Sequence, residues 1–256
     1  RIAHQRNLHP LGDARQDRGF DIHDRTQGEG VGVVFVEHHT IEAEFMGERF
    51  WLSRQGTDGD FSKYIQMYCE YDGKVDAFGV GGVDLYLRLD EREYPLHAAL
   101  KLVSGVKQTP LCDGRGLKHT LERRVFELAE PALGGKPHFH YAFVPVAVDR
   151  LGLAYAVESV SDQVIIGDLM VALGIPIPLR GIQAYKRLAR ILLPVVSYFP
   201  IGMLFYGSGG SEHEPKYVRY WQEADLLAGD FLFMRKYLPP DLKGKTVITN
   251  TTTEDN

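Results

Sequence analysis

The sequence has few cysteines, little net charge and no long uncharged apolar run, and each shortage argues against a class of protein. Cys69 and Cys112 are the only cysteines in 256 residues. One falls in a helical pattern and the other at a predicted strand end, which is typical of reduced thiols rather than of a disulfide framework, so we expect a cytoplasmic protein. The formal net charge of −5 and the pI near 6.1 provide no basic face for phosphates, and no nucleic-acid partner is expected.

Targeting segments are also missing from the sequence. No N-terminal stretch combines a basic start, an apolar centre and a small-residue cleavage site, so no export signal is predicted. The longest uncharged apolar stretch, residues 191–206, is short and interrupted by proline, which favours a kinked helix and loop over the core. The alternative is an interfacial membrane contact, because Lys186, Arg187 and Arg190 precede the stretch.

The chain falls into three regions by composition. Residues 1–30 are polar and lack an apolar period, which is typical of a loosely ordered tail. From Val31 onward, short β-branched runs alternate with helical patterns and predict an α/β fold, Rossmann-like, with mostly parallel sheets and flanking helices. Glycine and proline cluster at residues 134–137 and predict a boundary near 131–138. We therefore expect a tail (1–30), an N-terminal α/β subdomain (31–135) and a Rossmann-like subdomain (136–256).

Apolar spacing and turn residues predict the individual elements. One helix should begin after Asp58 or Asp60 and end at Asp72-Gly73, and a later helix through Leu117 and Leu128 should end at Pro131. The other predicted helices cover residues 96–103, 153–160 and 217–223, and the predicted strands cover 75–80, 109–112, 141–148, 163–167, 226–229 and 246–249.

Polar residues and glycines recur directly after the predicted strands. Ligands of open α/β sheets bind beyond the carboxyl ends of strands, so these residues should mark one functional edge. The alternative for each position is an ordinary turn or helix cap. The residues are Gly81, Gly82, Asp84, Asp113, Gly114, Gly116, Asp149, Gly152, Asp168, Asp230, Asn250 and Thr251.

The segment 113–120 has the composition of an anion site. Gly114 and Gly116 precede a predicted helix with Lys118 and Thr120 in its first turn, where a carboxylate or single phosphate could bind. The spacing is not that of a P-loop. Two alternatives for Lys118 are open, a general acid/base with its pKa lowered by burial or an ordinary solvated lysine.

Candidate metal donors and nucleophiles are present without a recognised spacing. His138 and His140 lie on one face of an extended segment, and His38-His39 and Glu212-His213-Glu214 add further donors. None of these groups has the spacing of a closed zinc site, so no metal is predicted. The sequence also lacks the Gly-x-Ser-x-Gly turn of α/β hydrolases.

Six longer segments form a distinctive set: GTDGDFSKYI, DGKVDAFGVGGVDLYL, CDGRGLKHTLERRV, IIGDLMVALGIPIPLR, ADLLAGDFLFMRKYLP and GKTVITNTTTED. Together they resemble the bacterial family labelled quinate 5-dehydrogenase, over most of residues 55–256. The resemblance implies an oxidoreductase that uses NAD(P) to oxidise a cyclic polyhydroxy carboxylate such as quinate. It also implies further α/β structure after Asn256, and since the sequence begins at Arg1 we expect it to be part of a longer protein.

The leading functional hypothesis assigns roles to the strand-end residues. Lys118 would transfer the proton, with Asp113 or Asp84 orienting it. Asp168 stands 168 − 149 = 19 positions after Asp149, close to the offset of a ribose-binding acid, and would favour NAD over NADP unless it caps the following segment. The predicted NAD-binding residues are Asp149, Gly152, Asp168, Asp230, Asn250 and Thr251, and the predicted substrate-binding residues are Gly81, Gly82, Gly114, Gly116 and Thr120.

The second hypothesis is a non-catalytic or regulatory α/β module that binds a small anionic ligand. It rests on the loop Asp149-Arg150-Leu151-Gly152, which stands where a dinucleotide enzyme carries Gly-x-Gly-x-x-Gly and holds one glycine for close approach of a pyrophosphate.

Overall fold

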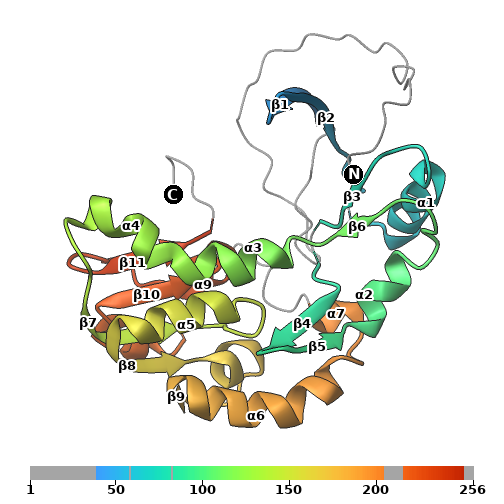
Figure 1. Ribbon diagram of the computed structural model, residues 1–256. Coiled ribbons are helices and arrows are strands. Elements are labelled where there is room, and N and C mark those ends of the chain that lie inside the picture. Colours follow the sequence, from blue (N-terminus) through green and yellow to red (C-terminus); the bar gives the residue numbers. More distant parts are fainter. Residues whose placement is uncertain (1–38, 58, 82, 205–215, 251–256) are drawn as a thin grey trace. The chain divides into compact units, whose positions relative to one another are not determined.

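The structure, a computed structural model, describes residues 39–57, 59–81, 83–204 and 216–250 (Figure 1). It has a mixed α/β fold with a five-stranded, mostly parallel sheet flanked by helices, which confirms the predicted fold class. The chain divides into two compact units, residues 1–78 with 105–110 and residues 79–104 with 111–256. The predicted tail, Gly82 and Thr251 lie outside the described residues.

The smaller unit contains an antiparallel hairpin of β1 (His39–Phe45) and β2 (Glu48–Arg54). The strands are joined at Met46 and Gly47, whose φ angles of 54° and 78° are those of a two-residue type I′ turn. The alternation that begins at Val31 predicted parallel strands. For residues 39–54 this prediction is wrong, because β1 and β2 are antiparallel. An isolated hairpin and a strand of a parallel sheet share the same β-branched composition.

The helix α1 (Phe61–Tyr71) has the predicted start and end. The carboxylate of Asp60 caps it by accepting a hydrogen bond of 2.8 Å from the amide of Ser62. Directly after the helix, Asp72 accepts hydrogen bonds from the amides of Lys107 at 2.7 Å and Thr109 at 2.8 Å. These bonds join the two sequence segments of the smaller unit.

Short elements follow along the chain: β3 (Phe78–Gly79), β4 (Tyr86–Leu89), β5 (Arg92–Pro95), α2 (His97–Leu102), β6 (Leu111–Cys112), α3 (Arg115–Thr120), a 3-10 turn η1 (Glu122–Arg124) and α4 (Val125–Leu133). The predicted end of a helix at Pro131 is wrong, because α4 continues to Leu133. Proline removes one hydrogen bond from this exposed helix without ending it, and Gly134, with φ of 75°, provides the left-handed cap.

The larger unit is organised around the sheet β11-β10-β7-β8-β9. Its strands are parallel except β9, which pairs with β8 in the antiparallel direction. The bounds are β7 (Phe139–Val144), β8 (Ser161–Ile166), β9 (Leu179–Arg180), β10 (Leu226–Gly229) and β11 (Thr246–Thr249). The four parallel strands were predicted from the sequence, with β7 and β8 displaced by up to four residues.

The order of the parallel strands contains a topological switch point. From β7 the chain passes through α5 (Leu151–Ser159) to β8 on one side, and it later enters β10 on the other side of β7. The connections therefore leave the sheet in opposite directions at β7 and β10. Open α/β sheets bind ligands in this place, beyond the carboxyl ends of the two strands.

Helices cover both faces of the sheet. On one face α8 (Val218–Glu223) and α9 (Phe231–Tyr237) pack against the strands through a core of Phe143, Trp221, Leu227 and Met234. On the other face lies α5, and α3 packs against it, so that α3, α4 and α5 share one side of the sheet (Figure 1). Burial of these large side chains supplies most of the stability of the unit.

The apolar stretch 191–206 begins inside α6 (Gly181–Val196), which contains Pro194 and is followed by α7 (Ile201–Leu204). The side chains of Ile182, Tyr185 and Leu193 are buried, in agreement with a helix that covers the core. No helix among the described residues has the length and apolar character needed to cross a membrane.

Candidate functional site

Lys118 lies between two carboxylates at the edge of the sheet in the larger unit. Its Nζ is 2.7 Å from Oδ2 of Asp84 and 3.2 Å from Oδ2 of Asp149. Burial acts to lower the pKa of Lys118, but the charges of Asp149 and Asp84 outweigh it and raise that pKa above its ordinary value. The two carboxylates therefore hold Lys118 in its charged form. The lowered pKa that was assumed for its role as a general acid/base is wrong.

Arg150, the residue after Asp149, forms the second cationic centre. Its side chain is 8% exposed and pairs with Glu122 in η1 and, at 2.7 Å, with Oδ2 of Asp230 after β10. Burial acts to lower the pKa of Arg150, and the carboxylates of Asp149, Glu122 and Asp230 raise it. Because Arg150 follows β7 and Asp230 follows β10, this ion pair spans the switch point of the sheet.

Asn250 connects β11 to the same network. Its side-chain amide donates to Oδ2 of Asp230 at 2.9 Å, and its carbonyl oxygen accepts from the amide of Phe231 at 3.1 Å. The structure thus joins Lys118 and four of the predicted strand-end residues through Arg150, whose Nε is 3.8 Å from Oδ2 of Asp149 and which also pairs with Glu122. We call the set the Lys118 cluster: Asp84, Lys118, Glu122, Asp149, Arg150, Asp230 and Asn250.

The Lys118 cluster has an excess of negative charge. Its cations are Lys118 and Arg150, and they face the four carboxylates of Asp84, Glu122, Asp149 and Asp230. The carboxylates are 13% to 26% exposed, so they are partly screened by water but remain close to the cations. An anion entering here would displace the cluster's own carboxylates from the two cations.

The glycine-bearing loop before α3 has a local structural role. Asp113 accepts a hydrogen bond of 3.0 Å from the amide of Leu85, and it forms an ion pair with Arg115 rather than with Lys118. Asp84 therefore orients the lysine, and Asp113 holds the loop. Gly114, with φ of 76°, makes the turn into the helix.

Thr120 is engaged inside its own helix, whereas the predicted substrate residues Gly81 and Gly116 face open space. The Thr120 hydroxyl donates to the carbonyl of Gly116 at 2.7 Å inside α3, and Lys118 lies in the last turn of this six-residue helix, so the predicted first-turn anion site is wrong. A Cβ built on Gly81 or Gly116 would meet nothing within 4 Å.

Gly152 is a packing residue in the structure. A Cβ at this position would lie 2.1 Å from the carbonyl oxygen of Lys118, so the absence of a side chain lets α5 approach α3. The first turn of α5 is covered, with Leu151, Gly152 and Leu153 all buried. The predicted contact of Gly152 with a pyrophosphate is therefore wrong, since α3 occupies the side of the glycine that the pyrophosphate would approach.

Asp168 is engaged by the backbone at the end of β7. Its two carboxylate oxygens accept hydrogen bonds from the amides of Ala147 at 2.8 Å and Val148 at 2.9 Å. Burial raises the pKa of Asp168 to about 7, although these two amides oppose the shift. With both oxygens committed, the carboxylate does not reach out to a ribose, and the predicted basis for preferring NAD over NADP is wrong.

The substitution Asp168→Asn tests this backbone role. The new side chain would offer one oxygen acceptor for two amide donors, so we expect the free energy of unfolding to fall by about 1–3 kcal/mol in chemical denaturation. The exposed Asp76 provides the control, since Asp76→Asn should change it by less than about 0.5 kcal/mol. Equal stabilities of the two variants would contradict the assigned contacts.

Sequence patterns missed Arg150 and Glu122 as members of the site. A signal for Arg150 was present, because it stands at the start of a helix whose following residues, Leu151 to Ala154, are all apolar or glycine. Glu122 lies four residues after Lys118, a spacing that places the two on one side of a helical segment.

A separate cavity of about 690 Å³ lies in the larger unit beside β8 and β9. Glu158, Arg180 and Arg219 line it. Two of its charged groups already have partners, because Glu158 accepts from the amide of Ile182 and Arg219 pairs with Glu223. No sequence pattern predicted this cavity.

Two consecutive parts of the chain match known protein families. Residues 36–113 match the family described as Domain of unknown function (DUF8753), and residues 116–256 match the family described as Domain of unknown function (DUF8754). The junction falls just before Lys118, so most of the Lys118 cluster lies within the second match and Asp84 within the first. No curated protein and no solved structure matches the chain.

Proposed function

We propose, for a chain that belongs to the family described as Domain of unknown function (DUF8754), that the Lys118 cluster binds a small polyhydroxylated ring compound and exchanges a proton with it through Lys118. The observation that carries the proposal is the Arg150–Asp230 ion pair across the switch point, with Lys118 and its two carboxylates beside it. Quinate and shikimate are the probe compounds.

The cluster contains both hydrogen-bond donors and carboxylate acceptors, so it suits a ligand with hydroxyl groups better than an anion without them. A hydroxyl both donates and accepts, so it can bond a carboxylate and a cation together. Among the buried atoms that the structure describes, Arg150 Nε and Glu122 Oε2 have no hydrogen-bond partner. Arg150 Nε is 3.8 Å from Oδ2 of Asp149, so its charge is paired although the hydrogen bond is not made, whereas an unsatisfied acceptor such as Glu122 Oε2 costs about 1–3 kcal/mol.

The charge state of Lys118 sets the direction of proton transfer. Because its pKa is raised, Lys118 is held as the ammonium by Asp84, so it can donate a hydrogen bond to a ligand hydroxyl, and it would give up a proton only in a reaction that makes that oxygen negative, such as reduction of a carbonyl group. Asp149 holds the ammonium from the other side. The carboxylate of a quinate-like ligand would point away from the cluster, because four carboxylates already surround the two cations.

The second candidate is the oxidoreductase of a cyclic polyhydroxy carboxylate. Lys118 as a proton donor to a carbonyl oxygen fits its reductive direction. Gly152 and Asp168, proposed for NAD, do not fit that cofactor, because one packs on Lys118 and the other holds the backbone after β7. We derive no step through NAD, and the proposal stands on ligand binding and proton transfer.

Thermal melting of the full chain with four compounds tests the proposal. Quinate and shikimate should raise the melting temperature by roughly 5–10 °C at a hundredfold excess over Kd, from about 2.7 kcal/mol of binding linkage. Cyclohexanecarboxylate, which lacks hydroxyls, and inorganic phosphate should have no effect. If phosphate or cyclohexanecarboxylate raised the melting temperature as much as quinate, the result would indicate an anion-binding module instead. If no compound changed the melting temperature, both the polyhydroxylated-ligand proposal and the anion-binding module would be refuted.

Variants of the cluster separate binding from proton transfer. Asp84→Asn leaves Lys118 paired with Asp149 and should abolish most of the quinate-induced shift, whereas Asp76→Asn should keep it. Lys118→Arg keeps the charge but cannot release a proton at neutral pH, so it should still bind. If absorbance at 340 nm shows NAD or NADP reduction with quinate, loss of that turnover in Lys118→Arg is expected. Unchanged turnover would remove the assigned role of the lysine.

A further inference from the structure

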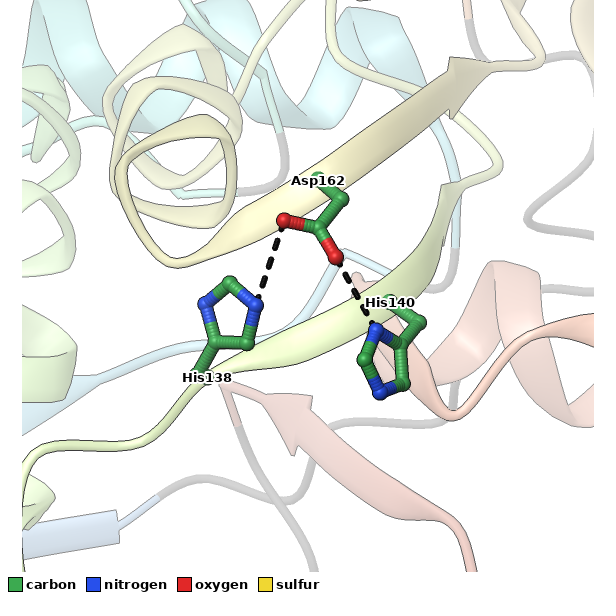
Figure 2. A group of neighbouring side chains, drawn as sticks. All are labelled: His138, His140 and Asp162. Atoms are coloured by element: carbon green, nitrogen blue, oxygen red, sulfur yellow. Dashed lines mark hydrogen bonds and ion pairs between the residues drawn. The ribbon is translucent and has the colours of Figure 1, made fainter.

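Two histidines and an aspartate meet on the surface of the larger unit, at the start of β7 and β8. His138 and His140 are two residues apart in extended backbone, which places both side chains on the same side. The pairs Phe139↔Ser161 and Tyr141↔Gln163 bring Asp162 beside His140. Figure 2 shows the aspartate between the rings, with one carboxylate oxygen directed at each histidine.

The three donor atoms are spaced as ligands of one metal ion would be. Asp162 Oδ1 is 3.1 Å from Nε2 of His138, and Oδ2 is 2.9 Å from Nδ1 of His140. The donor atoms all lie within 4.8 Å of one another. Two metal–ligand bonds of about 2.0–2.1 Å at a roughly tetrahedral angle separate their ligand atoms by about 3.3 Å, so small side-chain rotations suffice.

The backbone under this triad is fixed by a second aspartate. Asp225 accepts hydrogen bonds from the amides of His140 at 2.8 Å and Tyr141 at 2.9 Å. The strand that carries both imidazoles is therefore held in place without a metal. A prearranged set of donors binds an ion with little ordering cost.

Exposure of the triad keeps it accessible to an ion and to water. The side chains of His138, His140 and Asp162 are 62%, 85% and 51% exposed. Three protein ligands leave further positions on a divalent ion to water, as in open zinc sites. Two imidazoles and one carboxylate suit zinc and its neighbours in the transition series rather than magnesium or calcium.

We propose that His138, His140 and Asp162 bind one divalent transition-metal ion of the zinc type, in an open site bridging the starts of β7 and β8. The site is separate from the Lys118 cluster, which lies beyond the carboxyl ends of the strands. The His-x-His spacing was visible in the sequence, but the third ligand comes from the neighbouring strand, so no closed zinc motif could appear there.

Calorimetric titration of the full chain with ZnCl₂, after chelator treatment and dialysis, tests the site. Wild-type protein should show a binding event that weakens by about tenfold or more in His138→Ala, His140→Ala and Asp162→Asn. Asp76→Asn, which removes an exposed carboxylate elsewhere, should bind zinc as the wild type does. Since the three ligands are exposed, the melting temperatures of the metal-free variants should stay within about 2 °C of the wild type.

A second measurement, the zinc-induced change in melting temperature, distinguishes this site from zinc bound by other histidines of the chain. Zinc should raise the melting temperature of the wild type and of Asp76→Asn, and this rise should be lost in the three ligand variants. Zinc binding and a zinc-induced shift that persist in all three variants would overturn the proposal. Absence of zinc binding by the wild type would overturn it as well.

Discussion

Replacing Arg150 by methionine is expected to lower the free energy of unfolding by about 3–5 kcal/mol, the largest loss that we predict for a single charge. The substitution preserves much of the side-chain volume but leaves Glu122 and Asp230 without their shared cation. Chemical denaturation followed by circular dichroism measures the loss. If the variant does not fold, the double variant Arg150→Met/Glu122→Gln should recover part of the stability, because it removes a partly buried carboxylate that has lost its cation.

Arg124 provides a matched control for this prediction. It also pairs with a glutamate, Glu127, but both side chains are about 60% exposed. Exposed pairs contribute little, so Arg124→Met should cost less than about 1 kcal/mol. Comparable losses for Arg124→Met and Arg150→Met would contradict the assignment of Arg150 as the partly buried centre of the cluster.

Gly152→Ala is expected to lower the free energy of unfolding by about 3 kcal/mol, at the upper end of the usual cost of overpacking. The added methyl group would lie 2.1 Å from the carbonyl oxygen of Lys118, and this neighbour is backbone, so α3 itself must move. The shift would also displace Lys118 from Asp84 and Asp149. We therefore expect the variant to lose the quinate-induced melting shift together with stability.

The control for Gly152 is Gly116, which lies in α3 with open space around it. Gly116→Ala should leave stability unchanged or raise it by up to about 1 kcal/mol, because alanine is the better helix former. If Gly152→Ala proved as stable as Gly116→Ala, the close approach of α3 and α5 would be wrong. The role of Gly152 would then have to be assigned again.

Local sequence signals were sufficient where the cause of a structure is local. Asp60 was one of two residues predicted as the cap of α1, and the runs that form β10 and β11 were predicted with their observed bounds. The carboxyl-end rule predicted Asp84 and Asp149 at one edge of the sheet, and both carboxylates contact Lys118 in the structure.

The predictions failed where the cause lies in a distant segment. Nothing near Gly152 in sequence shows that the Lys118 carbonyl covers it, and nothing near Asp168 shows that the amides after β7 use both of its oxygens. β9 is a two-residue strand, too short for any alternation to be recognised. The partner of His140 likewise comes from another strand. In each case the contact depends on tertiary packing, which a periodic pattern does not contain.

The central claim is that a polyhydroxylated ligand binds at the Lys118 cluster, and an NMR titration of the ¹⁵N-labelled full chain with quinate tests it most directly. Amide resonances of residues 116–122 and 149–151 should shift in a saturable, concentration-dependent manner. Shifts centred instead on the cavity residues Glu158, Arg180 and Arg219, or no shifts at all with quinate, would contradict the claim.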